Sequence, residues 1–328
     1  GLHGFVIKEG FESQENLAAS LVKLYAKFGD LLYAKEVFDS FCCKNVVLWT
    51  SMLNGFVECG YPEKALATFY DMLRANVEPN RATILAVLSA CASMGSANIC
   101  EKVEEHVIAL GLQTDLQVST GLVDMHCKCG SIQCARRIFD DISSRDLALW
   151  SAMINGYACN GEGSEAVALF KEMQNRGVRP DAIVFTHVLT ACNHSGLVDE
   201  GIHCFQSMTA EYDIEPSIEH YMCMVDLLCK AGHLSSAMKF FRQMPVHLRN
   251  QVFAPLISAH NAHGANPSTE FSSEELWNLD PQDSGHCVQM SNILSCLGEW
   301  KKARSYRRLI NMQGLVKEPG WTCIEQHG

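Results

Sequence analysis

The sequence predicts an all-α fold, an α-solenoid of stacked helical hairpins. The chain repeats itself at an offset of 101 residues, and this register holds over several segments. Within each segment the apolar residues recur three and four positions apart, which is the spacing of an amphipathic helix. Glycine and proline interrupt the pattern at regular intervals and mark the turns between helices. Identical pairs at this offset include Leu48/Leu149, Trp49/Trp150, Met52/Met153, Gly55/Gly156, Gly60/Gly161, Ala65/Ala166, Phe69/Phe170 and Pro79/Pro180.

The repeating part divides into seven units at recurring proline or charged junctions. Their lengths run from 31 to 36 residues, and two longer units follow each of the short units 15–45 and 116–146. Residues 1–14 match the tail of an earlier unit, so we expect the chain to begin within a repeat and to be a fragment. Residues 250–328 no longer follow this pattern of repeating units. The seven units are 15–45, 46–80, 81–115, 116–146, 147–181, 182–217 and 218–249.

Unit 46–80 illustrates why each unit forms two helices. Trp49 and Phe56 belong to a first apolar stripe, which Gly60 interrupts before Phe69 continues a second one. Pro79 then ends the second helix. One hairpin cannot bury both stripes alone, whereas stacked neighbours can, and the first helices then line a concave face. We therefore expect the recurrent Trp, Phe, Met and Cys residues to form the core.

The composition describes a chain that can bury a core, with 48% hydrophobic and 19% charged residues. A formal charge of −11 excludes a uniformly basic nucleic-acid binder, although Lys and Arg can still gather in a groove. The 16 cysteines stand mostly at apolar positions, where reduced thiols behave as small hydrophobes, so we expect a reducing or organellar compartment. No apolar run reaches the ~18 residues of a membrane span, and we expect no membrane association.

The sequence shows no catalytic or metal-binding constellation. The zinc-deaminase signature, H-x-E followed by P-C-x-x-C, is absent. Phosphate-binding loops and the G-x-S-x-G nucleophile motif are absent as well. The nearest cysteine cluster, Cys127, Cys129 and Cys134, stands on ordinary repeat positions without the usual zinc spacing. We therefore expect a protein that is not an enzyme and that binds no cofactor or metal.

Helical units of these alternating lengths resemble the PLS class of pentatricopeptide repeat (PPR) proteins of plant organelles, whereas tetratricopeptide repeats keep a fixed period of ~34 residues. Residues 48–55 resemble the start of a P unit, 122–130 an S unit and 188–192 an L unit. Residues 250–328 resemble the family's E region, two further degenerate hairpins of tetratricopeptide type. The DYW deaminase domain that ends some members has no counterpart here.

The resemblance implies that each unit reads one base of single-stranded RNA through its fifth and last residues. The family code assigns adenine to Thr or Ser with Asn, and guanine to Thr or Ser with Asp, because a carboxylate accepts from the N–H groups of guanine. Ala19, Leu85 and Met222 cannot hydrogen-bond in this way and leave their bases undefined. The pairs are Ala19/Asn45, Thr50/Asn80 (A), Leu85/Asp115, Thr120/Asp146 (G), Ser151/Asp181 (G), Thr186/Ser217 and Met222/Arg249.

At the second position of three units, Val47, Ala148 and Ile183 could supply apolar surfaces that sandwich bases. Each polar pair also has a purely structural interpretation, as a solvated residue of the first helical turn and an N-cap or turn residue. Recurrence of these pairs at one register favours base recognition over that interpretation.

The resemblance implies a site-recognition factor for C-to-U editing of organellar RNA. A DYW-type deaminase and other editing factors, supplied in trans, would dock on residues 250–328. The mitochondrion is the expected organelle, with the chloroplast as the alternative. Two other functions stay open: a protein-binding solenoid, which the acidic charge favours, and an organellar RNA stabilisation or splicing factor.

Overall fold

The computed structural model describes residues 15–41, 43–245, 248, 249, 252, 256, 288, 291, 294, 295 and 298–312. Within these residues the elements are helices and no strand occurs, which confirms the all-α prediction. The chain divides into two compact bodies, an N-terminal body of residues 1–187 and a C-terminal body of residues 188–328. The predicted repeat tail at 1–14, and all of 250–328 except α19 and a few single positions, lie outside the described residues.

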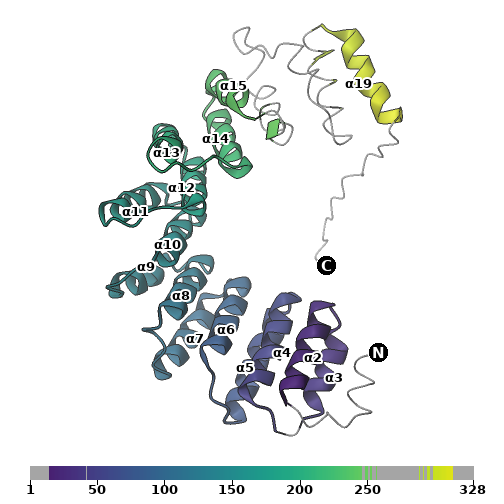
Figure 1. Cartoon of the computed structure of the whole chain (residues 1–328), viewed down its shortest axis with the longest axis vertical. Coiled ribbons are helices and arrows are strands. Elements are labelled where there is room, and N and C mark those ends of the chain that lie inside the picture. The colour runs from purple at the N-terminus through teal and green to yellow at the C-terminus, as the bar shows by residue number, and fades with distance from the viewer. Residues whose placement is uncertain are drawn as a thin grey trace, which may run out of the picture. The chain divides into compact units, whose positions relative to one another are not determined.

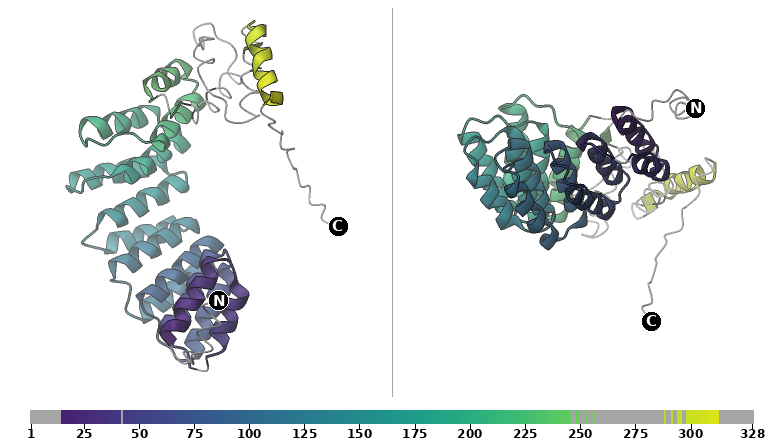
Figure 2. Two further views of the ribbon diagram at one scale, coloured as in Figure 1. Left: turned by 45° about the vertical axis from the view of Figure 1, so that its right-hand side comes forward. Right: turned by 90° about the horizontal axis from the view of Figure 1, so that it is seen from below.

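The N-terminal body is a stack of helix pairs in chain order. The first helices α2, α4, α6, α8 and α10 pack on one another in sequence, and each second helix packs on the first helix of its own pair (Figures 1 and 2). The pairs are α2 (Glu15–Lys27) with α3 (Leu31–Asp39), α4 (Val46–Glu58) with α5 (Pro62–Arg74), α6 (Arg81–Met94) with α7 (Ala97–Ala109), α8 (Leu116–Lys128) with α9 (Ile132–Asp141), and α10 (Leu147–Cys159) with α11 (Gly163–Asn175).

Helix α12 (Ala182–Ser195) crosses the boundary between the two bodies. Within the C-terminal body, α14 packs against both α13 and α15. Each sequence unit from 15–45 to 218–249 thus contains one pair of helices. The remaining described helices are α13 (Val198–Ala210), α14 (Ile218–Lys230), α15 (Leu234–Gln243) and α19 (Trp300–Met312).

A glycine in the left-handed region joins the two helices of a pair. Gly60 has a φ of 77° and Gly161 a φ of 76°, a conformation in which a Cβ atom is strained. The backbone N–H of Gly60 donates to the carbonyl of Val57, and α5 then begins at Pro62. Proline suits the first turn of a helix because it has no N–H to leave unpaired. These residues set the sharp reversal that the repeated glycines predict.

An aromatic pair joins each of the short repeats 15–45 and 116–146 to the repeat that follows it. Trp150 of α10 meets Phe139 of α9 edge to face, with ring centroids 5.0 Å apart and an interplanar angle of 77°. Trp49 and Phe38 repeat this arrangement at 4.9 Å and 77°. Edge-to-face rings gain ~0.5–1.5 kcal/mol beyond the area that they bury. The recurrent tryptophan therefore stabilises the contact between successive hairpins.

Small residues let successive first helices approach closely. A Cβ atom on Gly55 of α4 would lie only 2.8 Å from the Cβ of Ala26 on α2. At the same point of the next 101-residue period, a Cβ atom on Gly156 would overlap the thiol of Cys127 on α8. Contact this close leaves no room for any side chain at the glycine position. The two glycines therefore fix how near neighbouring hairpins can stack.

The cysteines of the described part form no disulfide, and half of them are buried. Burial raises the pKa of Cys91, Cys127, Cys192 and Cys229 to about 12. A thiol with so high a pKa is neutral near pH 7 and reacts slowly as a nucleophile. These residues act as small apolar groups in the packing, as their positions beside Ala, Leu and Met suggest.

Replacing Gly156 by alanine places a methyl group against the thiol of Cys127. We expect the free energy of unfolding to fall by about 1–3 kcal/mol, the usual cost of overpacking a core. Thermal unfolding followed by circular dichroism measures the loss. Adding Cys127→Ala should recover part of it, because Ala26 holds the equivalent place against Gly55.

Cys127→Ala alone is the control, and the four proteins form a double-mutant cycle. Independent, additive effects of the two substitutions would contradict direct contact between these residues.

Candidate functional site

The last residue of a repeat caps the first helix of the next repeat. A side-chain oxygen accepts a backbone N–H three residues on, which satisfies one of the unpaired donors at a helix start. These residues therefore cap helices, as their structural interpretation predicts. The caps are Asn45 to Leu48 (2.9 Å), Asn80 to Thr83 (3.0 Å), Asp146 to Leu149 (2.9 Å) and Asp181 to Val184 (2.9 Å).

Each capping side chain has two polar atoms, and the cap uses one of them. The second atom can still bond to another group. In Asn80 the oxygen Oδ1 caps α6, which leaves the Nδ2 amide with its two donors. In Asp146 and Asp181 the oxygen Oδ1 caps the helix, which leaves Oδ2 as an acceptor. The cap holds the side chain in one orientation, and the choice of Asn or Asp sets the polarity of the outward atom. One residue can therefore both cap a helix and select a hydrogen-bonding partner.

Thr50 and Asn80 meet through a residue of the following repeat. The hydroxyls of Thr50 and Thr83 lie 2.7 Å apart, and the Thr83 hydroxyl donates to Oδ1 of Asn80 over 3.0 Å. Thr50 is only 7% exposed and also donates to the carbonyl of Val46. Its oxygen has little room for a further partner. Asn80, which is exposed, is therefore more accessible to an outside group than Thr50.

The other fifth-position threonines bond back to their own helices. Thr120 donates to the carbonyl of Leu116 over 2.8 Å, and Thr186 donates to that of Ala182 over 3.0 Å. Both side chains are partly exposed. Because the single hydroxyl hydrogen is used within the helix, the threonine oxygen can only accept from an outside group.

Ser151 makes a different contact. Its Oγ lies 3.1 Å from Nδ1 of His187, which stands on the first helix of the next repeat. Burial lowers the pKa of His187, while a hydrogen bond to the backbone of Ser151 and the charge of Asp181 act in the opposite direction. The protonation of His187 therefore depends on both Ser151 and Asp181 at this junction.

Two junctions are poorly suited to recognise a base by hydrogen bonds. Ala19, paired with Asn45, is 5% exposed and has no polar atom. Leu85 is equally apolar, and its partner Asp115 binds Arg81 through Oδ2 at 3.4 Å while Oδ1 caps α8. Both carboxylate oxygens of Asp115 are therefore already engaged.

The three second-position residues lie exposed at the starts of their helices. Val47 is 46% and Ile183 is 59% exposed, and Ala148 is also exposed. An apolar side chain of this size, open to solvent beside a polar pair, offers a flat surface on which a base can stack.

The last two pairs behave differently. Thr186 belongs to the N-terminal body, and Ser217 belongs to the C-terminal body, where its hydroxyl donates to Glu219 and lies 2.8 Å from Nδ1 of His220. Arg249 bonds the carbonyls of Met244 and Arg242, so its guanidinium secures the loop after α15. Its partner position, Met222, is 41% exposed.

Three contributing residues were not singled out from the sequence. Thr83 could have been found, because Asn80-x-x-Thr83 has the spacing of a capping box. Arg81 and His187 carry no local signal, since each acts on a residue more than thirty positions away in the chain. Only the stacking of hairpins brings them to the junction.

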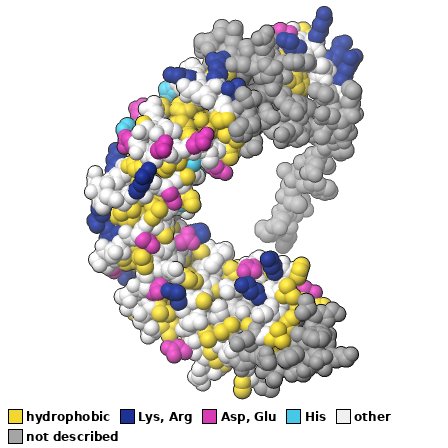
Figure 3. All heavy atoms as spheres, in the orientation of Figure 1, with side chains coloured by type: hydrophobic (Ala, Val, Ile, Leu, Met, Phe, Trp, Pro, Cys, Tyr) yellow, Lys and Arg dark blue, Asp and Glu magenta, His cyan; other side chains and the backbone are white. Residues whose placement is uncertain are grey.

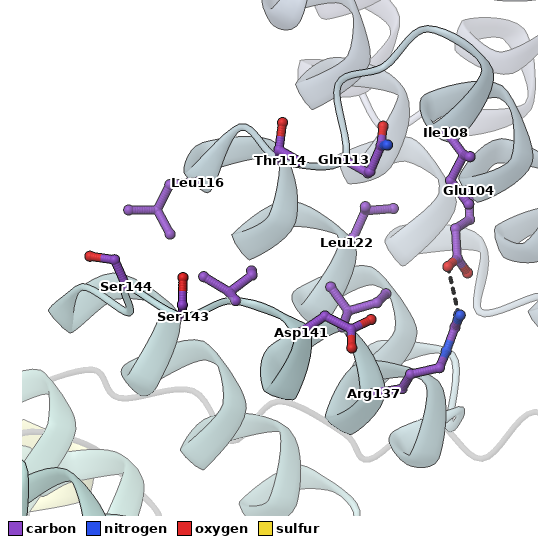
Figure 4. Close-up of a pocket in the computed structure, with 12 residues that line it drawn as sticks. Glu104, Ile108, Gln113, Thr114, Leu116, Leu122, Arg137, Asp141, Ser143 and Ser144 are labelled. Atoms are coloured by element: carbon purple, nitrogen blue, oxygen red, sulfur yellow. Dashed lines mark hydrogen bonds and ion pairs between the residues drawn. The ribbon is translucent and has the colours of Figure 1, made fainter.

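A cavity of about 490 Å³ opens elsewhere in the N-terminal body, between α7, α8 and α9. Glu104 and Arg137 face one another across it at 2.7 Å (Figure 4). The second oxygen of Glu104 contacts Nε2 of buried His126 at 2.9 Å, and this hydrogen bond lowers the pKa of Glu104 against the opposing effect of burial. The cluster links three helices, which points to a structural role, while Nδ1 of His126 is buried without a hydrogen-bond partner.

The described part of the chain contains no group of three or more His, Cys, Asp or Glu residues placed to hold a metal ion. Among the same residues, no helix combines the length and apolarity needed to cross a membrane.

Replacing the capping residue separates its two tasks. Asp181→Ala removes the acceptor for Val184 N–H, and we expect a loss of about 1 kcal/mol of stability. Asp181→Asn keeps the cap, because Asn and Asp cap helices about equally well, and should leave stability nearly unchanged. The melting temperatures of both variants are compared by thermal unfolding. Asp146→Ala and Asp146→Asn repeat the comparison at a second junction. Equal melting temperatures for the Ala and Asn variants would show that the cap is energetically unimportant.

The repeats match known sequences. A model of the PPR repeat family matches residues 44–93 and 145–194. Two further PPR repeat models match residues 183–211 and 212–245.

Similar proteins occur in Arabidopsis thaliana. The pentatricopeptide repeat-containing protein At4g30700 is 37% identical over 324 residues, which are 99% of this chain and 41% of that protein. At5g40410, mitochondrial, is 36% identical over 327 residues, 100% of this chain and 54% of the relative. At3g57430, chloroplastic, is 33% identical over 339 aligned residues, 100% of this chain and 38% of the relative. The chain spans about half the length, or less, of these curated relatives.

The fold also resembles a solved structure. The crystal structure of the pentatricopeptide repeat protein PPR10 in complex with an 18-nt psaJ RNA element has a TM-score of 0.67 and 16% identity, and the match covers 95% of this chain and 47% of that one. The repeat sequences, the helical hairpins and the relatives that match almost all of this chain agree, and the chain belongs to the pentatricopeptide repeat family.

Proposed function

We propose that the chain is a sequence-specific factor for single-stranded RNA, with one base recognised at each suitable junction of units 15–249. The observation that carries the proposal is the double use of the capping residue. Beside the oxygen that caps the helix, Asn80 keeps two amide donors, and Asp146 and Asp181 each keep a second carboxylate oxygen that can accept. The fold match to PPR10, which was crystallised with an RNA element, supports this ligand class.

The chemistry of the outward atoms supports the base assignments. Adenine has an acceptor, N1, on its Watson–Crick edge, and the amide of Asn80 can donate to it. Guanine has N–H donors at N1 and N2, and the carboxylates of Asp146 and Asp181 can accept from them. The proposed bases are A for Thr50/Asn80, and G for Thr120/Asp146 and Ser151/Asp181. The exposed Val47, Ala148 and Ile183 would hold bases by stacking.

Because the formal charge is −11, the net charge of the chain repels RNA, and side chains at particular places must hold it. Acidic and basic side chains alternate over the face of the repeats seen in Figure 3, while Lys and Arg gather over α19. Helix α19 carries Lys301, Lys302, Arg304, Arg307 and Arg308.

We further propose that the RNA is organellar and that the chain recognises sites of C-to-U editing, with a DYW-type deaminase and other factors docking on residues 250–328. Helix α19 supports a docking role, since it combines its basic side chains with Trp300, which is 68% exposed. Such a surface suits an acidic partner. The names of relatives include both organelles, and the mitochondrion is our first choice over the chloroplast.

Exchanging Asn and Asp at two junctions should exchange the preferred bases. Asp181→Asn supplies a donor and should move the preference from G toward A at the nucleotide opposite 147–181. Asn80→Asp should move it from A toward G at the nucleotide opposite 46–80. Each change should amount to about 1–3 kcal/mol, the usual worth of a good base-edge contact. Binding to RNAs that differ by single bases, at fixed salt, measures it.

Each variant is the control for the other, because the two substitutions change the net charge in opposite directions. A uniform change in affinity for all RNAs would mean that these residues only cap helices. Absence of salt-dependent RNA binding in the unaltered protein would favour the protein-binding solenoid instead.

Sequencing of organellar transcripts from a plant line that lacks the protein tests the editing proposal. We expect one or a few cytidines, 3′ of sites with A and G at the assigned positions, to remain unedited at normal transcript abundance. Complementation with the chain lacking 250–328 should restore RNA binding without restoring editing. Normal editing accompanied by reduced transcript abundance or retained introns would point to RNA stabilisation or splicing.

A further inference from the structure

Two thiols from neighbouring repeats lie in direct contact. The Sγ atoms of Cys100, on α7, and Cys129, at the carboxyl end of α8, are 2.7 Å apart. The sulfur atoms of a disulfide lie ~2.05 Å apart, so these two need to approach each other only about 0.7 Å further. The two cysteines are 29 positions apart in the chain, and the stacking of unit 116–146 on unit 81–115 brings them together.

The thiol pair is not a general property of the repeat. In the register of the units, the positions that correspond to Cys100 and Cys129 are held by Gly201 and Ala231 at the junction of units 182–217 and 218–249. Stacking at this point of the repeat therefore does not depend on sulfur. The packing role of the other buried cysteines does not account for two thiols in contact.

The two thiols differ in their access to solvent. Cys100 is buried, whereas Cys129 is partly exposed and stands next to the turn at Gly130. Burial and the neighbouring Cys129 thiol raise the pKa of Cys100, so the Cys100 thiol stays protonated near pH 7. A reagent in solution therefore reaches Cys129 first, and Cys100 reacts only with a sulfur atom that is already beside it.

We propose that Cys100 and Cys129 are a site of reversible oxidation, at which a low-molecular-weight disulfide such as oxidised glutathione links units 81–115 and 116–146 covalently. The Cys129 thiolate attacks one sulfur of oxidised glutathione and releases a glutathione thiolate, which takes up the proton that Cys129 lost. Cys100 Sγ then attacks Cys129 Sγ, the bond from Cys129 to glutathione breaks, and the Cys100 proton goes to the departing thiolate. In sum, two protein thiols become one disulfide while one oxidised glutathione becomes two reduced molecules.

Contact between the sulfur atoms offsets the low acidity of Cys100. The second step takes place within one molecule, and reacting groups held side by side act at effective concentrations far above that of free glutathione. The new bond closes a loop of chain between positions 100 and 129, and such a link stabilises a fold mainly by restricting the unfolded chain. It also holds α7 to the end of α8. This site is independent of the RNA recognition proposed above.

The test uses the whole chain, equilibrated with mixtures of reduced and oxidised glutathione, quenched with acid and alkylated. Tandem mass spectrometry of its proteolytic peptides identifies the linked cysteines. We expect a Cys100–Cys129 disulfide as the main link, reversed by dithiothreitol. The oxidised protein should melt about 5 °C or more above the reduced protein, in keeping with the usual worth of a disulfide.

Cys129→Ala should abolish both the link and the difference in melting temperature, and alanine fits because Ala231 stands at the corresponding position. Cys91→Ala is the matched control, since the Cys129 thiol also lies 3.7 Å from the carbonyl oxygen of Cys91, and it should keep both. A link from Cys129 to Cys91, glutathione retained on Cys129, or oxidation confined to other cysteines would each overturn the inference. None of these results bears on base recognition, which the RNA-binding measurements on the reduced protein test separately.

Discussion

The close stacking of successive first helices is the constraint on which the rest of this structure depends. Gly55 lies against Ala26, and Gly156 lies against Cys127, at separations that admit no side chain on the glycine. The edge-to-face contact of Trp150 with Phe139 adds a second attachment between neighbouring hairpins. Because interiors are packed to crystal density, the separation of the helices is fixed at these two contacts. The same tight contact therefore recurs 101 residues later in the chain.

The junction then gives one side chain two tasks. A capping oxygen must accept a backbone N–H, and either Asn or Asp does so with similar energy. The fold is therefore nearly indifferent to which of the two stands at Asn80 or Asp181, although the outward atom differs completely in polarity. Specificity can change at such positions without a cost in stability. This separation explains how a repeat protein could alter the sequence that it recognises while its core stays the same.

The junctions are nevertheless not equivalent, because the following repeat modifies each one. Thr83 lies between Thr50 and Asn80, while Nδ1 of His187 lies 3.1 Å from the hydroxyl oxygen of Ser151. At the junction between units 81–115 and 116–146, Arg81 occupies the second oxygen of Asp115. A two-residue description of a repeat leaves out these neighbours. The hydrogen-bonding character of a junction belongs to a pair of adjacent repeats.

The sequence by itself determined the helical hairpins, their order and their boundaries to within a few residues, since the 101-residue period, the apolar spacing and the glycine turns are local signals. It also placed Asn80, Asp146 and Asp181 at helix starts, where local hydrogen bonds settle their conformation. Only the tertiary structure decided that Thr50 is buried and that Ser151 bonds His187. Those contacts join residues more than thirty positions apart, and a periodic pattern specifies which face of a helix is buried but not which polar atoms meet across the stacked faces.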